Sequence, residues 1–152
     1  MEINGKNQGE IAKARGMLQA QQTKLQQIRA AMQETKSEML DLDLRHHDLR
    51  ATGDINKMMA IKSRSIALNK SVAGLTSSEA ECRQRVESME RYLETLTRKL
   101  EGLRHESTRL AEEIAADGVA PDVRATLQSL ASRIKMQMEA LEGKRRSGPI
   151  KL

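Results

Sequence analysis

The fold is decided by residues 58–114, which read MMAIKSRSIALNKSVAGLTSSEAECRQRVESMERYLETLTRKLEGLRHESTRLAEEI. Apolar residues recur in this stretch at alternating intervals of three and four positions. Such a seven-residue repeat places the first (a) and fourth (d) residues of each heptad on one face of a slightly under-wound helix, as in a coiled coil. We call this row of a and d positions the seam. It predicts one long helix that packs against other helices, because most helical stability in proteins comes from packing of an apolar face.

The seam of this stretch is apolar at all but three of its seventeen positions, the exceptions being Ser65, Glu79 and Ser107. Its a positions are Met58, Ser65, Val72, Glu79, Val86, Leu93, Leu100, Ser107 and Ile114. Its d positions are Ile61, Leu68, Leu75, Cys82, Met89, Leu96, Leu103 and Leu110. An earlier stretch repeats the pattern, with seam positions Ile11, Ala14, Leu18, Gln21, Leu25, Ile28, Met32, Thr35, Met39, Leu42, His46 and Leu49.

Turn-forming residues divide the chain into three expected helices, at about 10–51, 55–116 and 121–143. Gly53 and Asp54 supply a glycine stop and an aspartate N-cap between the first two helices. Pro121 is suited to the first turn of the third helix. Residues 74–78 could interrupt the long helix. Because the heptad register passes through them unchanged, we expect a weak point in the helix there and not a break. Residues 1–9 are expected to form a flexible arm and residues 144–152 a flexible basic tail.

Pairing of the seams predicts how the helices meet. The third seam consists of Val123, Leu127, Leu130, Ile134, Gln137 and Leu141. In an antiparallel hairpin the numbers of facing residues sum to a constant. A turn at Gly53 and Asp54 gives a sum of 107 and places Ile11 opposite Leu96. A turn at Gly118 and Val119 gives a sum of 237 and places Leu141 opposite Leu96 as well. We expect an all-α fold, an elongated antiparallel coiled coil of three helices, with one long central helix covered by helix one and helix three. A parallel homodimer or trimer through the long helix is the alternative.

The composition fits a thin seam better than a globular core. The chain has one Tyr, no Phe, no Trp and 31% charged residues, whereas compact cores draw on aromatic side chains. No apolar run approaches the ~20 residues of a membrane span, and the N-terminal residues lack the layout of a signal peptide. We expect a cytoplasmic protein. Cys82, the only cysteine, occupies a seam position and is expected to be a buried, inert thiol.

Large apolar residues on the outer faces of the first hairpin suggest a protein interface. They are Leu40, Leu44, Ile55, Met59 and Ile66. A two-stranded coiled coil buries only its seam, so further apolar residues indicate that something docks there. The expected partner is a second copy or a different protein. The alternative is that helix three or the N-terminal arm folds over these residues.

The C-terminal tail is the most basic segment. It contains Lys144, Arg145, Arg146 and Lys151 and no acidic side chain, within a chain of net charge +5. Such a tail can contact nucleic-acid phosphates, anionic lipid or an acidic protein surface. A solvated terminus without a partner is the alternative. Because Tyr92 is the only aromatic residue, stacking on single-stranded bases is not expected.

No motif in the sequence predicts catalysis. Phosphate-binding glycine loops, a Ser-His-Asp arrangement and zinc-spaced cysteines are missing from the sequence. The adjacent His46 and His47 project in different directions on a helix, so a metal site is conceivable only across subunits. We therefore expect no enzyme, no catalytic, cofactor-binding or metal site, and no small-molecule substrate.

The expected function is that of a non-enzymatic coiled-coil scaffold, stalk or adaptor that acts through helix packing with itself or a partner protein. A nucleic-acid packaging or architectural protein that uses the basic tail is the alternative. In length, positive charge and helical-hairpin form the chain also resembles the small stalk proteins of flagellar and type III secretion export ATPases, which are antiparallel coiled coils. The break between Gly118 and Pro121 departs from a plain two-helix hairpin. Virus or phage assembly scaffolds and small subunits of multiprotein tethers fit the sequence about as well.

Overall fold

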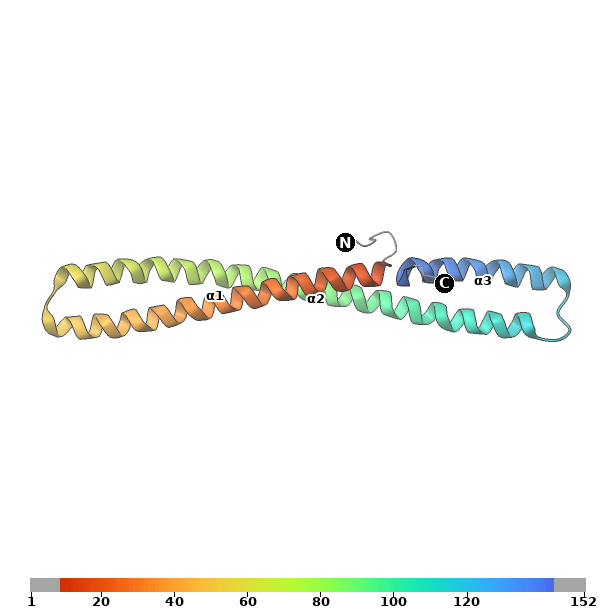
Figure 1. Cartoon of the computed structure of the whole chain (residues 1–152), viewed down its shortest axis with the longest axis horizontal. Coiled ribbons are helices and arrows are strands. Elements are labelled where there is room, and N and C mark those ends of the chain that lie inside the picture. The colour runs from red at the N-terminus through yellow and green to blue at the C-terminus, as the bar shows by residue number, and fades with distance from the viewer. Residues whose placement is uncertain (1–8, 144–152) are drawn as a thin grey trace, which may run out of the picture. The chain divides into compact units, whose positions relative to one another are not determined.

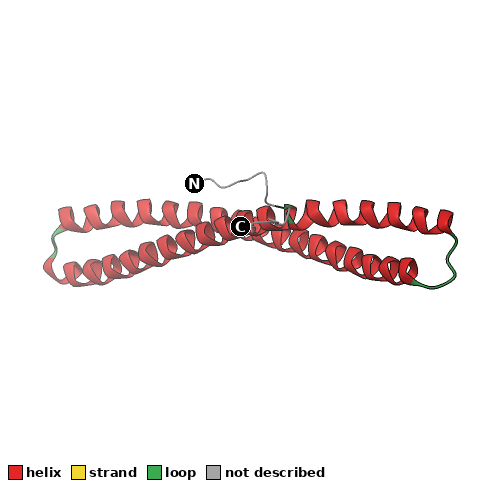
Figure 2. Ribbon diagram, turned by 45° about the vertical axis from the view of Figure 1, so that its right-hand side comes forward, coloured by secondary structure: helices red, strands yellow, loops and turns green. Residues whose placement is uncertain are grey.

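The computed structural model describes residues 9–143 and consists of three α-helices (Figure 1). These are α1 (Glu10–Thr52), α2 (Ile55–Ala115) and α3 (Pro121–Glu142). The described residues contain no strand (Figure 2). The helix limits differ from the expected ones by one residue at most, and α2 continues without a break through residues 74–78. No helix in this part of the chain combines the length and the apolar character that a membrane span requires.

The chain divides into two compact units. Unit 1 comprises, within the described residues, 9–18 and 88–143; it contains the start of α1, the second part of α2 and all of α3. Unit 2 comprises residues 19–87, which are the rest of α1 and the first part of α2.

The helix ends follow the turn residues of the sequence. Gly53 has a φ of 71°, a left-handed conformation that favours glycine, and its N–H donates to the Leu49 carbonyl at 3.1 Å. Asp54 caps α2, because its carboxylate accepts a hydrogen bond from the Lys57 N–H at 3.1 Å. Pro121 occupies the start of α3, as expected. Local chemistry therefore fixes the end of α1 and the starts of α2 and α3.

In unit 2, α1 and α2 lie side by side and are joined by the turn at Gly53 (Figures 1 and 2). Glu38 of α1 pairs with Arg64 of α2 at 2.9 Å. Farther from the turn, Arg29 pairs with Glu79 at 3.1 Å. These contacts are those of helices packed in a bundle.

The two seams predicted for α1 and α2 are the protected faces of these helices. Every seam position from Ile11 to Leu49 and from Met58 to Ile114 is buried or half-buried. Glu79, a polar seam residue, keeps its carboxylate at the edge, where Arg29 and Arg83 pair with it at 3.1 and 3.3 Å. The three-four spacing was thus sufficient to identify the packing face of both helices, and that prediction is confirmed.

The predicted seam of α3 is partly wrong. Val123, Leu130 and Gln137 were expected inside but are exposed. The protected side of α3 contains instead Arg124, Leu127, Ala131, Ile134, Met138 and Leu141. Both stripes contain Leu127, Ile134 and Leu141 and have the same spacing. The observed stripe places Met138 rather than Gln137 inside, so no uncharged amide has to be buried without partners. Arg124 at its edge donates to the Ala116 carbonyl at 3.3 Å.

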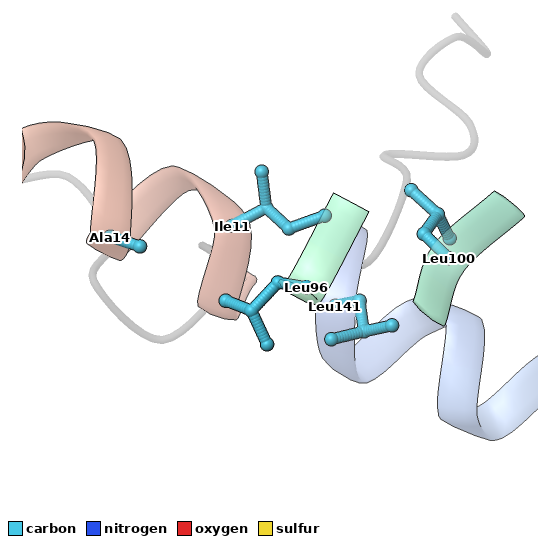
Figure 3. Packing of buried hydrophobic residues seen from close by; sticks show 5 residues of the cluster. All are labelled: Ile11, Ala14, Leu96, Leu100 and Leu141. Atoms are coloured by element: carbon cyan, nitrogen blue, oxygen red, sulfur yellow. The ribbon is translucent and has the colours of Figure 1, made fainter. Parts of the chain in front are cut away.

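The core of unit 1 lies where the start of α1 and the end of α3 meet on α2. Its buried residues are Ile11, Ala14, Leu96, Leu100 and Leu141 (Figure 3). Leu93, Leu103 and Met138 pack against it and are partly buried. The predicted meeting of the first and third helices at Leu96 is therefore confirmed.

Candidate interaction surface

All five residues proposed as a protein interface are exposed in unit 2. Leu40 and Leu44 of α1, and Ile55, Met59 and Ile66 of α2, have between 52% and 68% of their surface accessible. We call these five residues the unit 2 apolar face. The structure shows their exposure, and their role in binding stays a prediction. The arm that was considered as a cover lies, apart from Gly9, outside the described residues.

The α1 part of this face carries more acidic than basic residues, with five acidic and three basic side chains from Glu34 to Arg50. Leu40 and Leu44 line an open, shallow hollow together with Ser37, Glu34, Glu38 and Asp41. Asp48 follows one heptad after Asp41 on the same row of the helix. An apolar partner seated on α1 would therefore meet carboxylates at its edge.

The α2 part of this face is basic. From Ile55 to Ser78, α2 carries four cations, Lys57, Lys62, Arg64 and Lys70, and no acidic residue. Met59 and Ile66 are interleaved with these cations along the helix. The two helices of unit 2 therefore surround the exposed apolar side chains with charges of opposite sign.

Several of these charges have no ion-pair partner within residues 9–143. Arg64 pairs with Glu38, Arg45 with Asp41 at 3.2 Å, and Lys57 with Asp54 at 3.9 Å. The residues of the region that form no such pair in the described part of the chain are Glu34, Lys36, Asp43, Asp48, Arg50, Lys62 and Lys70. Charges of both signs remain available to a partner.

Unit 1 contains a tight junction between helix ends. A Cβ atom added to Gly9 would clash with the Gly143 nitrogen and with the Leu141 carbonyl oxygen. The N-terminus of α1 thus abuts the C-terminus of α3, and their partial charges of opposite sign attract. A hollow beside the junction is lined by Ile11, Ala12, Arg15, Thr97, Leu100, Arg104 and Glu142. Its Arg104 and Glu142 pair with each other.

Gly9→Ala is expected to destabilise unit 1 by ~1–3 kcal/mol, because backbone atoms cannot yield to the added methyl group as a flexible side chain could. Thermal unfolding followed by circular dichroism measures the effect. Gly9 directly precedes α1, and the control is Gly16→Ala within α1, where an added Cβ meets nothing within 4 Å. The control should gain up to ~1 kcal/mol. Equal stabilisation by both substitutions would contradict the close contact at Gly9.

The remaining polar groups of unit 1 include Arg109, which pairs with Glu106 and with Glu113. Within the residues that the structure describes, no three His, Cys, Asp or Glu side chains are grouped so that they could hold a metal ion. The hydrogen bond and charge of Glu106, with the charge of Glu113, raise the pKa of Arg109. The predicted anion-binding residues Lys144, Arg145, Arg146 and Lys151 lie outside the described residues.

A second group of exposed apolar residues was missed by sequence reasoning. Val123, Leu130 and Met136 of α3 are exposed, although the first two were expected in the seam. The missed signal was the alternative stripe through Ala131 and Met138, which contains no polar residue between Leu127 and Leu141.

Comparison with known proteins adds no relative. No protein-family model matches the chain, and no curated protein or solved structure matches it significantly. The function is therefore inferred from the residues of the chain and their geometry.

Proposed function

We propose that this chain is a non-enzymatic interaction protein, a scaffold, stalk or adaptor, that acts by packing its helices with itself or with a partner protein. The observation that carries the proposal is the exposure of the unit 2 apolar face. The seams of α1 and α2 already account for the packing of these helices on each other. Five further large apolar side chains remain accessible on the same unit. Clustered exposed apolar side chains of this kind mark sites of association.

The proposal includes an antiparallel coiled coil as the platform that carries this face. It is supported by the protection of every predicted seam position in α1 and α2. It is also supported by the ion pairs Glu38–Arg64 and Arg29–Glu79, whose residue numbers sum to 102 and 108. An antiparallel pairing of the two seams requires a sum near 107. The two observed sums differ by six residues, which is less than two helical turns. Exposed ion pairs contribute little to stability, so the seam supplies most of the binding energy of the platform.

The alternative, nucleic-acid packaging through the basic tail, rests on composition alone. Lys144, Arg145, Arg146 and Lys151 supply four cations in nine residues. Binding to phosphates through them would weaken steeply as salt concentration rises. Association through Leu44 and Ile66 would depend little on salt, because burial of apolar surface is its driving force.

The double variant Leu44→Glu with Ile66→Glu is expected to weaken association at least ~100-fold. Full burial of each side chain contributes ~1.5–3 kcal/mol, and each 1.4 kcal/mol is tenfold in affinity. Helix content should be unchanged, since both side chains are exposed. Association is measured by sedimentation velocity of the purified chain and by co-purification from cell extract.

The matched control is Gln27→Glu with Gln84→Glu. It adds the same charge to exposed positions of the same two helices, away from the unit 2 apolar face. The control should associate as the unaltered chain does. If the double variant keeps every association of the unaltered chain, the proposed function is wrong.

A further inference from the structure

We propose that α3 is a lid on the second part of the α2 seam, and that the start of α1 holds this lid closed. The lid is α3, residues 121–142, and we call residues 9–18 the clasp. All the contacts involved lie within unit 1. The inference goes beyond the proposed function, because it does not involve the unit 2 apolar face.

Most of the lid is held on α2 by few buried side chains. Leu141 is the one buried residue among the 22 of α3. The rest of its protected side, from Arg124 to Met138, is only half-buried. Segments with few buried apolar contacts open at a lower free energy than the whole protein. The part of α3 before Leu141 therefore contributes little to keeping the lid on α2.

The contacts that hold α3 are concentrated at its C-terminal end. Leu141 belongs to the buried cluster of unit 1 (Figure 3), and Met138 packs against that cluster. Glu142 pairs with Arg104, the one ion pair between α3 and α2 in the part of the chain that the structure describes. In α1, by contrast, the buried residues are spread along the helix and are Ile11, Ala14, Leu25 and Leu42. Release of one end is therefore enough to free α3.

The clasp forms part of this holding end. Ile11 and Ala14 belong to the same buried cluster as Leu141. The backbone of Gly9 lies directly against that of residues 141–143. The N-terminus of α1 and the C-terminus of α3 also attract each other through partial charges of opposite sign. If the clasp moves away, Leu141 loses part of its cover and the lid loses its main anchor.

The turn between α2 and α3 is suited to act as the hinge. Gly118 has a φ of 82°, and a Cβ added there would meet nothing within 4 Å. The Arg124 hydrogen bond at this end goes to the Ala116 carbonyl, which follows α2. Lids turn on a few loop residues that absorb the change in φ and ψ.

Opening of the lid would uncover part of the α2 seam. α3 lies alongside the second part of α2 (Figures 1 and 2). The seam there contains Leu100 and Leu110, which are buried, and Leu103, which is half-buried. Unit 2 comprises residues 19–87 and contains no part of the lid. The lid thus controls access to these seam residues while unit 2 stays folded.

Native-state hydrogen exchange of the full-length chain, resolved by residue with NMR, measures the opening of the lid. The Arg124 N–H donates to the Ala120 carbonyl at 2.9 Å and is the first bonded amide of α3. We expect amides 124–142 to exchange at least ~10-fold faster than the best-protected amides of α2, because they open without global unfolding. Equal protection of the two sets would overturn the lid.

Ile11→Ala tests the clasp from the α1 side, because it adds no atom near α3. The substitution should speed exchange of amides 124–142 at least ~10-fold and leave the α2 amides of unit 2 unchanged. Met17→Ala is the matched control within the clasp, at a residue that is 58% exposed, and it should leave α3 exchange unchanged. Faster exchange confined to residues 10–18 would show that the clasp does not hold α3. A uniform rise over the whole chain would show that α3 does not open separately. Either result would overturn the inference.

Leu141→Ala tests the same coupling from the α3 side. The Lys13 N–H donates to the Gly9 carbonyl at 3.1 Å, so amides 13–18 report on the clasp. Their exchange should rise at least ~5-fold in Leu141→Ala, since Ile11 loses a partner in the shared cluster. Leu130→Ala, the same change at an exposed position of α3, should leave these amides unchanged. Unchanged exchange of amides 13–18 in Leu141→Ala would overturn the coupling.

Discussion

Leu141→Ala is expected to lower the free energy of unfolding by ~2–5 kcal/mol, the range for removing a large aliphatic side chain from a packed core. Leu141 is 1% exposed and belongs to the cluster in which α1, α2 and α3 meet. Ile11 of α1 and Leu96 of α2, two other members of this cluster, would then line a cavity. Urea denaturation followed by circular dichroism measures the loss.

Leu130→Ala is the matched control for Leu141→Ala. It makes the same chemical change in the same helix, at a residue that is 41% exposed. We expect a loss below ~1 kcal/mol, as is usual for surface positions. Similar losses for the two variants would mean that α3 packs through the stripe containing Leu130, contrary to the structure.

Cys82→Asp is the second substitution with a large expected effect. Cys82 is fully buried, and its sulfur lies 3.4 Å from the Gln21 carbonyl oxygen and 3.6 Å from the Gln21 Oε1. A carboxylate there would face oxygen atoms and would have to be desolvated without a cationic partner. We expect a loss of at least ~3 kcal/mol from an uncompensated buried charge.

Cys82→Ala separates the effect of charge from that of volume. It removes only the sulfur and should cost ~1–2 kcal/mol, toward the lower end of cavity-forming substitutions. Gln84→Asp is the exposed control, because it places the same carboxylate two residues away on the same helix without burying it. Thermal unfolding of the three variants should rank Cys82→Asp far below the other two. A Cys82→Asp protein as stable as Cys82→Ala would contradict burial of the seam.

The packing faces of α1 and α2 could be predicted from the sequence because a long, regular repeat fits only one rotation of each helix about its axis. Twenty-nine seam positions, from Ile11 to Leu49 and from Met58 to Ile114, fix the rotation of these helices together, so a polar residue such as Glu79 does not disturb it. The helix ends were predictable for a different reason. Gly53, Asp54 and Pro121 act through local backbone chemistry that does not depend on the partner helix.

The rotation of α3 could not be predicted in the same way. The helix has 22 residues, and its apolar residues fit two stripes that share Leu127, Ile134 and Leu141. Whether Leu130 or Ala131 faces α2 depends on how closely the backbones of α2 and α3 approach each other. The spacing of residues along the sequence gives no information on that distance. The close contact of Gly9 with Leu141 was inaccessible for the same reason.

The candidate surface was predictable in its residues but not in its surroundings. Leu40, Leu44 and Ile66 stand outside the seam, so their exposure follows from the heptad register. Which charged residues form ion pairs could not be predicted from the spacing of residues, because long side chains such as that of Arg64 can reach several partners. The choice of Glu38 as the partner of Arg64 depends on how the two helices pack.

The fold-back of residues 19–87 on themselves is the central claim, since it creates the surface from which the function is inferred. The most direct test is the distance between spin labels at Lys24→Cys and Arg85→Cys in a Cys82→Ala background, diluted with unlabelled chain so that only labels in one chain are measured. Both positions are exposed in unit 2. Packed helix axes are ~8–10 Å apart, so with the label linkers we expect a distance below about 30 Å. A distance near ~90 Å, the length of about 61 residues in one continuous helix, would contradict the hairpin and favour a parallel assembly of extended chains.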